Sequence, residues 1–128
     1  MTNVEIVTKG YSDFSTGNVE AVLAIWDPEI EWHECKGMPF VNGDGIYKGH
    51  DEVMKNVLMQ LPVYFDGFNI EVTEIFGADD KVVMVGYYRG TNKATGNPFE
   101  ANATQVWTVK NVKMTHFFQA ADTVTIIS

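Results

Sequence analysis

Residues 17–34 read GNVEAVLAIWDPEIEWHE, and they predict a helix that leads directly into a strand. Asn18 can cap the helix, and Asp27 followed by Pro28 can end it. The apolar face of that helix would carry Val19, Val22, Leu23 and Trp26. From Glu29 to Cys35 apolar and polar residues alternate, which is typical of a strand with one face in the core.

The alternation in this strand assigns each side chain to a face. Ile30, Trp32 and Glu34 share one face, because successive side chains of a strand point in opposite directions. The other face carries Glu31, His33 and Cys35. The first face is the more apolar, so we expect it to point into the protein. Glu34 is therefore predicted to lie inside and His33 outside.

Helices are predicted on both sides of this unit. Thr2 and Glu5 have the spacing of a capping box at the start of a first helix. Its apolar residues recur at helical intervals as Val4, Val7, Tyr11 and Phe14. Residues 36–49 are rich in glycine and predict a loop, with at most a short strand at Ile46 and Tyr47. A third helix then follows, with Met54, Val57, Leu58 and Leu61 facing inward, and Pro62 is expected to end it.

The second half of the chain predicts four long strands joined by hairpin turns. They cover residues 68–76, 81–91, 99–109 and 112–121. On the strand at 99–109 the inward face would carry Phe99, Ala101, Ala103, Gln105, Trp107 and Val109. Gln105 is the one polar group on that face. Helices followed by an antiparallel sheet indicate an α+β fold.

Length, charge and cysteine content narrow the possible functions. A chain of 128 residues fits one domain, residues 1–128. Its net charge of −8 argues against binding to nucleic acid or to an anionic membrane. The single cysteine, Cys35, cannot form an internal disulfide, and residues 1–10 do not have the pattern of a signal peptide. We therefore expect a cytoplasmic protein.

Three motifs, in the right order, resemble one family. GNVEAVLAIWDPEIEWHE (residues 17–34), GIYKGHDEV (residues 45–53) and VKMTHFFQAADT (residues 112–123) are similar to segments of nuclear-transport-factor-2-like proteins, in particular SnoaL-like polyketide cyclases and ketosteroid isomerases. The resemblance covers nearly the whole chain. It implies a cystatin-like roll, in which a cone-shaped, strongly curved antiparallel sheet wraps around three N-terminal helices. Such proteins have a deep pocket and usually form homodimers through the outer face of the sheet.

The resemblance also implies roles for individual residues. Glu34 falls where ketosteroid isomerases carry the aspartate that moves the proton, so it is the expected catalytic residue. Gln105 falls near their protonated acid, which donates a hydrogen bond to the enolate. Gln119 falls where limonene-epoxide-hydrolase-like members carry a catalytic aspartate, and Asp122 matches the acid that closes the last strand. The register of that strand would turn Thr115, Phe117, Gln119 and Ala121 inward.

These positions together predict a mostly apolar pocket without metal or cofactor. Its expected ligand-binding residues are Trp32, Tyr47, Ala103, Gln105, Trp107, Phe117, Gln119 and Asp122. A glutamate in such surroundings has its charged form disfavoured, which raises its pKa toward the range useful for a general base. The expected ligand is a small apolar or carbonyl-containing molecule. The predicted reaction is proton abstraction next to a carbonyl, as in an isomerase or a polyketide-cyclase-like lyase.

Several departures from the family leave other functions open. The isomerases' first-helix tyrosine corresponds to Gly10, and Tyr11 lies one position away, about 100° around the helix. Glu34 can instead pair with Lys36 or Lys48 at the surface. Gln105 and Gln119 can bond each other rather than a ligand. The chain can therefore also be a non-catalytic carrier or sensor of an apolar ligand, or a dimeric interaction module that uses the outer-face residues Val106, Met114, His116 and Phe118.

Overall fold

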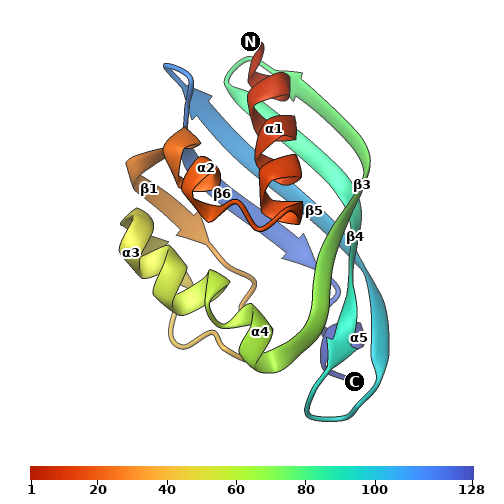
Figure 1. Ribbon diagram of the computed structural model, residues 1–128. Helices are drawn as coiled ribbons and strands as arrows, with labels where there is room; N and C mark the ends of the chain where they lie inside the picture. Colours follow the sequence, from red (N-terminus) through yellow and green to blue (C-terminus); the bar gives the residue numbers. More distant parts are fainter.

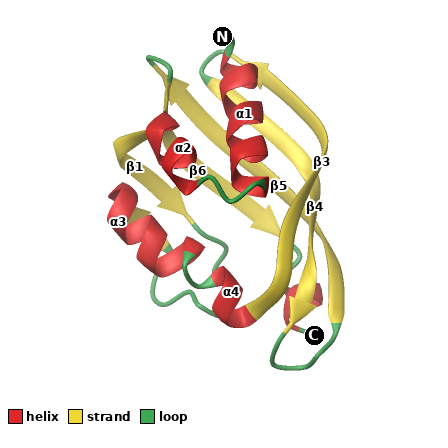
Figure 2. Cartoon of the chain, in the orientation of Figure 1, coloured by secondary structure: helices red, strands yellow, loops and turns green.

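The computed structural model describes residues 1–128 and contains short helices packed on one curved sheet (Figure 1; Figure 2). The helical segments are α1 (Asn3–Ser15), α2 (Val19–Ile25), α3 (Gly49–Val53), the π-helical turn η1 (Met54–Leu58), α4 (Leu61–Tyr64) and α5 (Thr123–Ile127). The strands are β1 (Trp26–His33), β2 (Ile46–Lys48), β3 (Phe65–Ala78), β4 (Lys81–Asn92), β5 (Pro98–Lys110) and β6 (Lys113–Ala121). The predicted α+β class is confirmed.

The six strands form one sheet in the order β2-β1-β6-β5-β4-β3. Neighbouring strands are antiparallel except β1 and β6, which run parallel. The sheet bends strongly along β3 and β4, and its two edge strands do not meet (Figure 1). This is the curved sheet that the resemblance implied, and its concave face encloses a core together with the helices.

The two N-terminal helices begin as the sequence predicts. Thr2 and Glu5 form a reciprocal capping box at the start of α1, and the Asn18 side chain accepts a hydrogen bond from the backbone of Ala21 at the start of α2. The two helices lie across the concave face of the sheet (Figure 1). The predicted end of α2 is wrong by one residue: Trp26 is extended and belongs to β1. The physical reason is Pro28, which disfavours a helical conformation at the preceding residue, so the chain is extended before it reaches the proline.

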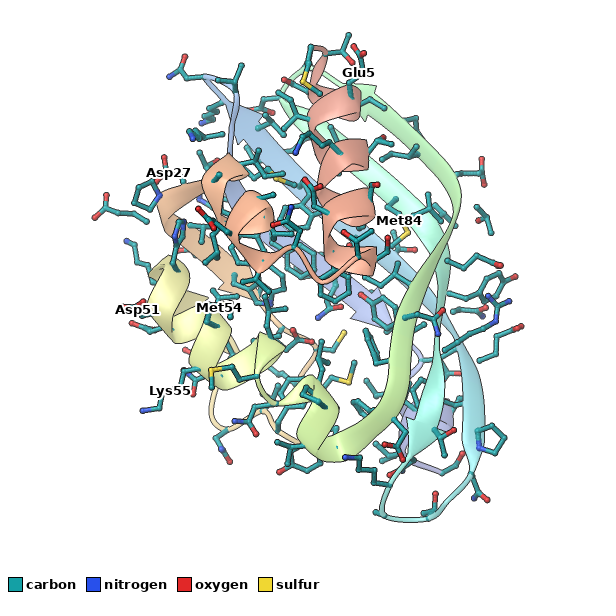
Figure 3. All side chains as sticks on the ribbon, viewed as in Figure 1. Glu5, Asp27, Asp51, Met54, Lys55 and Met84 are labelled. Carbon is teal, nitrogen blue, oxygen red and sulfur yellow. The ribbon has the colours of Figure 1, made fainter.

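The third helical region differs from its prediction at Pro62. The proline does not end a helix; it lies in the first turn of α4, where its missing N–H costs no helical hydrogen bond. Figure 3 shows Asp51 and Lys55 on the outer side of α3 and η1, pointing away from the sheet. On the inner side of this region Val53 and Val57 are buried. The short helix α5 was not predicted.

A bulge in β6 changes the register that the family pattern implied. Thr108 pairs with His116, but the next residue, Val109, pairs with Met114, so Thr115 has no partner opposite it. An extra residue of this kind locally shifts the alternation of side chains. Met114 is consequently buried at 1% exposure, and the prediction that it belongs to the outer face is wrong. Beyond the bulge the predicted alternation is confirmed, with Phe117 and Gln119 buried.

Candidate functional site

A cavity of about 70 Å³ lies between the helices and the concave face of the sheet. Most of its lining is apolar and aromatic, and it comes from α1, α2, η1, α4, all long strands and the loop after β1. The amide and carboxyl side chains that reach it are those of Glu34, Gln105 and Gln119. A small apolar cavity with a few convergent polar groups is the usual form of a small-molecule site.

Glu34 follows the last residue of β1, and Gly45, which precedes β2, holds its backbone in place. Its backbone N–H donates to the carbonyl oxygen of Gly45 at 2.9 Å, next to the point where β2 begins to pair with β1. Gly45 has a φ of 74°, a left-handed conformation that favours glycine, and a Cβ there would lie 3.0 Å from the Glu34 carbonyl oxygen. The side chain of Glu34 points inward and the residue is 6% exposed. The predicted orientation of the strand is confirmed.

The Glu34 carboxylate is held by hydrogen bonds alone. Trp32 donates its indole N–H to Oε1 at 2.9 Å, and the backbone N–H of Cys35 donates to Oε2 at 3.2 Å. No ion pair of the protein includes Glu34, so neither Lys36 nor Lys48 neutralises it. Burial raises the pKa of Glu34 to about 7, because removal from water disfavours the charged form more than the Trp32 and Cys35 donors favour it.

The two glutamines are neighbours across the β5–β6 ladder and are joined through a tyrosine that the sequence analysis missed. Gln105 Nε2 donates to the Tyr88 hydroxyl, and that hydroxyl donates to Oε1 of Gln119. Gln119 Nε2 in turn donates to Oε2 of Glu34. The glutamines therefore neither bond each other directly nor wait unpaired for a ligand. The inward position of Tyr88 could have been predicted from the sequence, because Tyr88 continues the alternation of inward-facing residues that includes Val82 and Met84 on β4.

Tyr11 also belongs to the site, although its position in the sequence argued against it. Its hydroxyl donates to Oε1 of Gln105 at 2.6 Å and accepts the indole N–H of Trp107 at 2.8 Å. Gly10, at the position of the isomerases' tyrosine, also lines the cavity. Because the adjacent residues Gly10 and Tyr11 of α1 both border the cavity, the offset of one position does not remove Tyr11 from it. Burial raises the pKa values of Tyr11 and of Tyr88, so both hydroxyls stay protonated.

Three tryptophans form much of the aromatic wall. The ring centroids of Trp26 and Trp32 lie 5.1 Å apart, and those of Trp32 and Trp107 lie 5.7 Å apart. All three line the cavity. Their rings offer a broad apolar surface to a ligand, while two of their indole N–H groups are already used inside the polar network.

Four of the predicted pocket residues do not line the cavity. Phe117 lies behind Trp32, with the two rings stacked at 3.8 Å, so Trp32 presents the surface instead. Ala103 is buried in the core two residues before Gln105 on β5. Tyr47 packs against the core from β2, an edge strand of the sheet. Asp122 is exposed and caps α5 by accepting hydrogen bonds from Thr125, which hold its pKa below the usual value. The other four, Trp32, Gln105, Trp107 and Gln119, line the cavity.

The remaining reactive side chains near Glu34 point elsewhere. Cys35 faces a second, open hollow at the outer side of the sheet, and burial with the nearby Glu34 raises the pKa of its thiol to about 11. His33 pairs with Glu31 at 2.9 Å on the same outer side. No three His, Cys, Asp or Glu side chains are grouped so that they could hold a metal ion. None of the helices is long and apolar enough to span a bilayer.

Comparison with known proteins supports the same fold and family. Residues 7–117 match the family model described as the SnoaL-like domain. No curated protein matches the chain in sequence.

Among solved structures, a nuclear-transport-factor-2-like protein from Burkholderia thailandensis E264 is 34% identical, with a TM-score of 0.90 over 98% of this chain and 95% of that one. A second such protein, of unknown function, from Burkholderia pseudomallei K96243 is 26% identical, with a TM-score of 0.88 over 99% and 96%. A hypothetical protein with a ketosteroid isomerase-like fold from Catenulispora acidiphila DSM 44928 is 15% identical, with a TM-score of 0.73 over 91% and 84%.

Proposed function

The chain belongs to the SnoaL-like domain family, and on that premise we propose that its cavity binds a small neutral carbonyl compound and that Glu34 acts as the general base. Glu34 would remove a proton from the carbon next to the carbonyl group. The family includes isomerases and cyclases, and both kinds of enzyme can begin with this step. Ligand and reaction here are inferred from the site itself.

The single observation that supports the proposal most is the isolation of the Glu34 charge. Its carboxylate is the one carboxyl group among the cavity residues, and no lysine, arginine or histidine lines that cavity. With a pKa of about 7 it is populated in both protonation states near neutral pH, as an efficient general base requires. A buried acid whose pKa is raised by desolvation in a cavity is a recognised mark of a functional site.

The size and charge of the cavity favour a small neutral ligand. A volume of about 70 Å³ suits a compact ring better than a large polycyclic molecule, unless the lining moves. An anionic ligand would meet Glu34 without any cation to balance either charge, so it is disfavoured. The wall of tryptophan rings suits an apolar or unsaturated ring.

The proposed step balances as a simple proton transfer. A carboxylate oxygen of Glu34 forms a bond to the proton while the carbon–hydrogen bond breaks. The electron pair of that bond forms a carbon–carbon double bond, and the carbonyl π electrons move to oxygen, which gives an enolate. Return of the proton from Glu34 to another carbon of the conjugated system gives an isomer, and attack of the enolate carbon on a second carbonyl gives a ring.

Cyclopent-3-enone is a suitable probe, because it is a compact ring whose isomerisation yields a conjugated ketone that absorbs in the ultraviolet. We expect the protein to accelerate this isomerisation and the exchange of its α-hydrogens for deuterium. Glu34→Gln should lower both rates by at least about 100-fold, the usual scale of general-base catalysis. Glu71→Gln, which removes a carboxylate from the outer face, is the matched control and should react as the native protein does.

A native rate in Glu34→Gln would rule out Glu34 as the base. Ligand-induced thermal stabilisation without any exchange or isomerisation would instead identify a carrier or sensor of apolar molecules.

We also propose that the outer face of the sheet forms a homodimer interface. Phe118 is 55% exposed there and Phe76 is 51% exposed. Two copies related by a twofold axis could bury these rings against each other. Sedimentation velocity should show a dimer of the native chain and a monomer of Phe118→Lys, whereas an unchanged dimer in the variant would place the interface elsewhere.

A further inference from the structure

The cavity contains a buried negative charge that belongs to no ion pair. When Glu34 is ionised, it is the one charged side chain on the cavity wall, and none of the ion pairs includes it. A buried charge without a partner is costly, and a group of opposite charge placed next to it lowers that cost. The electrostatic complement of this cavity is therefore a ligand with one positive charge.

The hydrogen bonds of the wall restrict which kind of cation suits the cavity. Both carboxylate oxygens of Glu34 already accept protein donors. So do the other side-chain oxygens on the wall, which belong to Tyr11, Tyr88, Gln105 and Gln119. A primary ammonium group brings three N–H donors that need acceptors. A metal ion needs several ligands, and no three His, Cys, Asp or Glu side chains are grouped to supply them. A tetraalkylammonium group carries the charge without any N–H, so it needs neither.

Three tryptophan rings provide a second attraction for such a group. The ring centroids lie 5.1 Å apart for Trp26 and Trp32, 5.7 Å for Trp32 and Trp107, and 6.3 Å for Trp26 and Trp107. The centre of a triangle with these sides is about 3.3 Å from each corner, so a cation up to about 5 Å above its plane lies within the ~6 Å range of cation–π attraction for all three rings. Tryptophan is the side chain whose ring attracts cations most strongly.

The rings and the carboxylate lie close enough to act on one ligand. The plane of Trp26 is turned 47° from that of Trp32 and 40° from that of Trp107, so the three rings do not stack face to face on one another. One face of Trp32 is stacked on Phe117, which leaves only its other face for a ligand. The indole N–H of Trp32 donates to Glu34 at 2.9 Å, so the carboxylate lies at the edge of this ring. A cation over the free face of Trp32 is therefore also near the negative charge.

We propose that the cavity also binds small tetraalkylammonium cations, with a trimethylammonium group against the tryptophan rings and beside the ionised Glu34. This group is more compact than the cyclic ketone, so it suits a cavity of about 70 Å³. The inference goes beyond the proposed function, because it requires the buried carboxylate but no proton abstraction. A bound cation occupies the place of the ketone and therefore blocks the proposed reaction.

Choline and its carbon isostere test the inference directly. 3,3-Dimethylbutan-1-ol has the shape of choline, with a carbon atom in place of the charged nitrogen. Isothermal titration at pH 8 should show that choline binds at least about tenfold more tightly than this alcohol, because only choline is attracted by the rings and by the carboxylate. Choline should also compete with cyclopent-3-enone and slow its isomerisation.

The affinity for choline should depend on the ionisation of Glu34. Its pKa of about 7 means that most of it is ionised at pH 8 and protonated at pH 6, so choline should bind up to about tenfold more weakly at pH 6. The alcohol should not lose affinity at pH 6. Burial raises the pKa values of Tyr11, Tyr88 and Cys35, so these groups stay protonated at both values. His33 points to the outer side of the sheet, where it has its own carboxylate partner.

Two variants assign the selectivity to the carboxylate and to the rings. Glu34→Gln should bind choline at least about tenfold more weakly at pH 8 and independently of pH, whereas Glu71→Gln removes the same charge from the outer face and should bind as the native protein does. Trp26→Leu should lower the ratio of choline affinity to alcohol affinity by about fivefold, and this ratio is insensitive to a change in cavity size because the two ligands have the same shape. If Trp26→Leu does not fold, Trp26→Phe should lower the ratio by less.

The opposite results contradict the inference. Equal affinities for choline and the alcohol would mean that the cavity recognises shape alone. An equal loss in Glu71→Gln and Glu34→Gln would mean that the net negative charge of the protein attracts choline without a specific site. Absence of choline binding in a protein that isomerises cyclopent-3-enone would overturn the inference and leave the proposed function intact. Selective choline binding without any reaction of the ketone would support the inference and overturn the proposed function.

Discussion

The two faces of the sheet treat charge in opposite ways. On the outer face the guanidinium of Arg89, on β4, lies 2.9 Å from Glu71 of β3 and 2.7 Å from Glu100 of β5, and it also lies over the ring of Tyr87. Each of these charged groups has a partner of opposite sign and is partly hydrated. On the inner face Glu34 is almost fully buried and forms no ion pair. The charges on the outer face are thus paired although exposed ion pairs add little to stability. The Glu34 carboxylate on the inner face has no cationic partner although a buried unpaired charge is costly.

The contrast indicates which face carries function. An exposed ion pair adds little to stability, because water and salt screen it. A buried carboxylate without a cation lowers stability whenever it is ionised, since folding removes it from water. A protein that only needed to fold would be more stable with an apolar residue at position 34. The placement of Glu34 is therefore better explained by chemistry in the cavity than by the needs of the fold.

The largest difference between the faces should appear in two adjacent phenylalanines. Phe117 is stacked on Trp32 and packs at a tilt against Trp107, whereas Phe118 is 55% exposed on the other side of the same strand. Phe117→Ala should lower the free energy of unfolding by about 3–5 kcal/mol, because it leaves a void in the aromatic core. Phe118→Ala should change it by less than about 0.5 kcal/mol in denaturant titrations at a concentration where the chain is monomeric. Equal losses would mean that the two faces are not distinct in packing.

A large part of the inner face could be predicted from periodicity alone. The alternation from Ile30 to Glu34 placed the acid inside, and the same period of two placed Gln105 inside on β5. Both placements depend only on the alternation of side chains along one strand, which a few neighbouring residues reveal. The capping box at Thr2 is equally local. Such features follow from short stretches of sequence, so they can be predicted without knowledge of the rest of the fold.

The connections between elements could not be predicted in this way. That Gln105, Tyr88 and Gln119 come together depends on the strand order and on a common register across three strands. The bulge at Thr115 moved Met114 inward, and no local pattern marks it. The loop after β1 brings Met38 to the cavity, and this loop packs against a residue distant in sequence, because Gly37 lies against Thr123. Tyr88 differs from these, because its alternation along β4 could have been recognised.

The second prediction concerns the pH dependence of stability on the inner face. The folded pKa of Glu34, about 7, lies above the value of 4.5 for an unperturbed glutamate, so the folded state holds its proton more tightly than the unfolded state does. The free energy of unfolding should therefore fall as pH rises from about 4.5 to about 7 and then level off, by up to about 3 kcal/mol from this group. Denaturant titrations at pH 4.5, 6 and 8 measure the slope.

The corresponding variants assign that slope to its residue. Glu34→Gln should remove this contribution, because an amide does not titrate. Glu71→Gln on the outer face should retain it. A native-like slope in Glu34→Gln would show that Glu34 is ionised at an ordinary pH and that the inner face does not isolate its charge.

A third, smaller effect separates the support of Glu34 from backbone strain in the same loop. Gly43 and Gly45 have nearly the same positive φ, 72° and 74°, but only Gly45 approaches the Glu34 backbone. Either substitution by alanine should cost about 1–2 kcal/mol through the left-handed conformation. Gly45→Ala should cost more than Gly43→Ala and should also slow cyclopent-3-enone exchange, because it displaces the Glu34 carbonyl. Equal effects on exchange would mean that Gly45 does not position the acid.

The smallest effect is expected at the outer ion pairs. In Glu100→Gln the Arg89 guanidinium keeps its contact with Glu71, and all three side chains are already about one-third to one-half exposed. Thermal unfolding should therefore shift less than in any of the inner-face variants, and 1 M salt should remove what difference there is, because it screens exposed charges within about 3 Å. Exchange of cyclopent-3-enone should be unchanged. A loss of stability as large as that of Phe117→Ala, persisting in high salt, would show that the outer charges hold the curved sheet in shape. In that case the isolation of Glu34 would no longer single out the inner face, because both faces would depend on specifically placed charges.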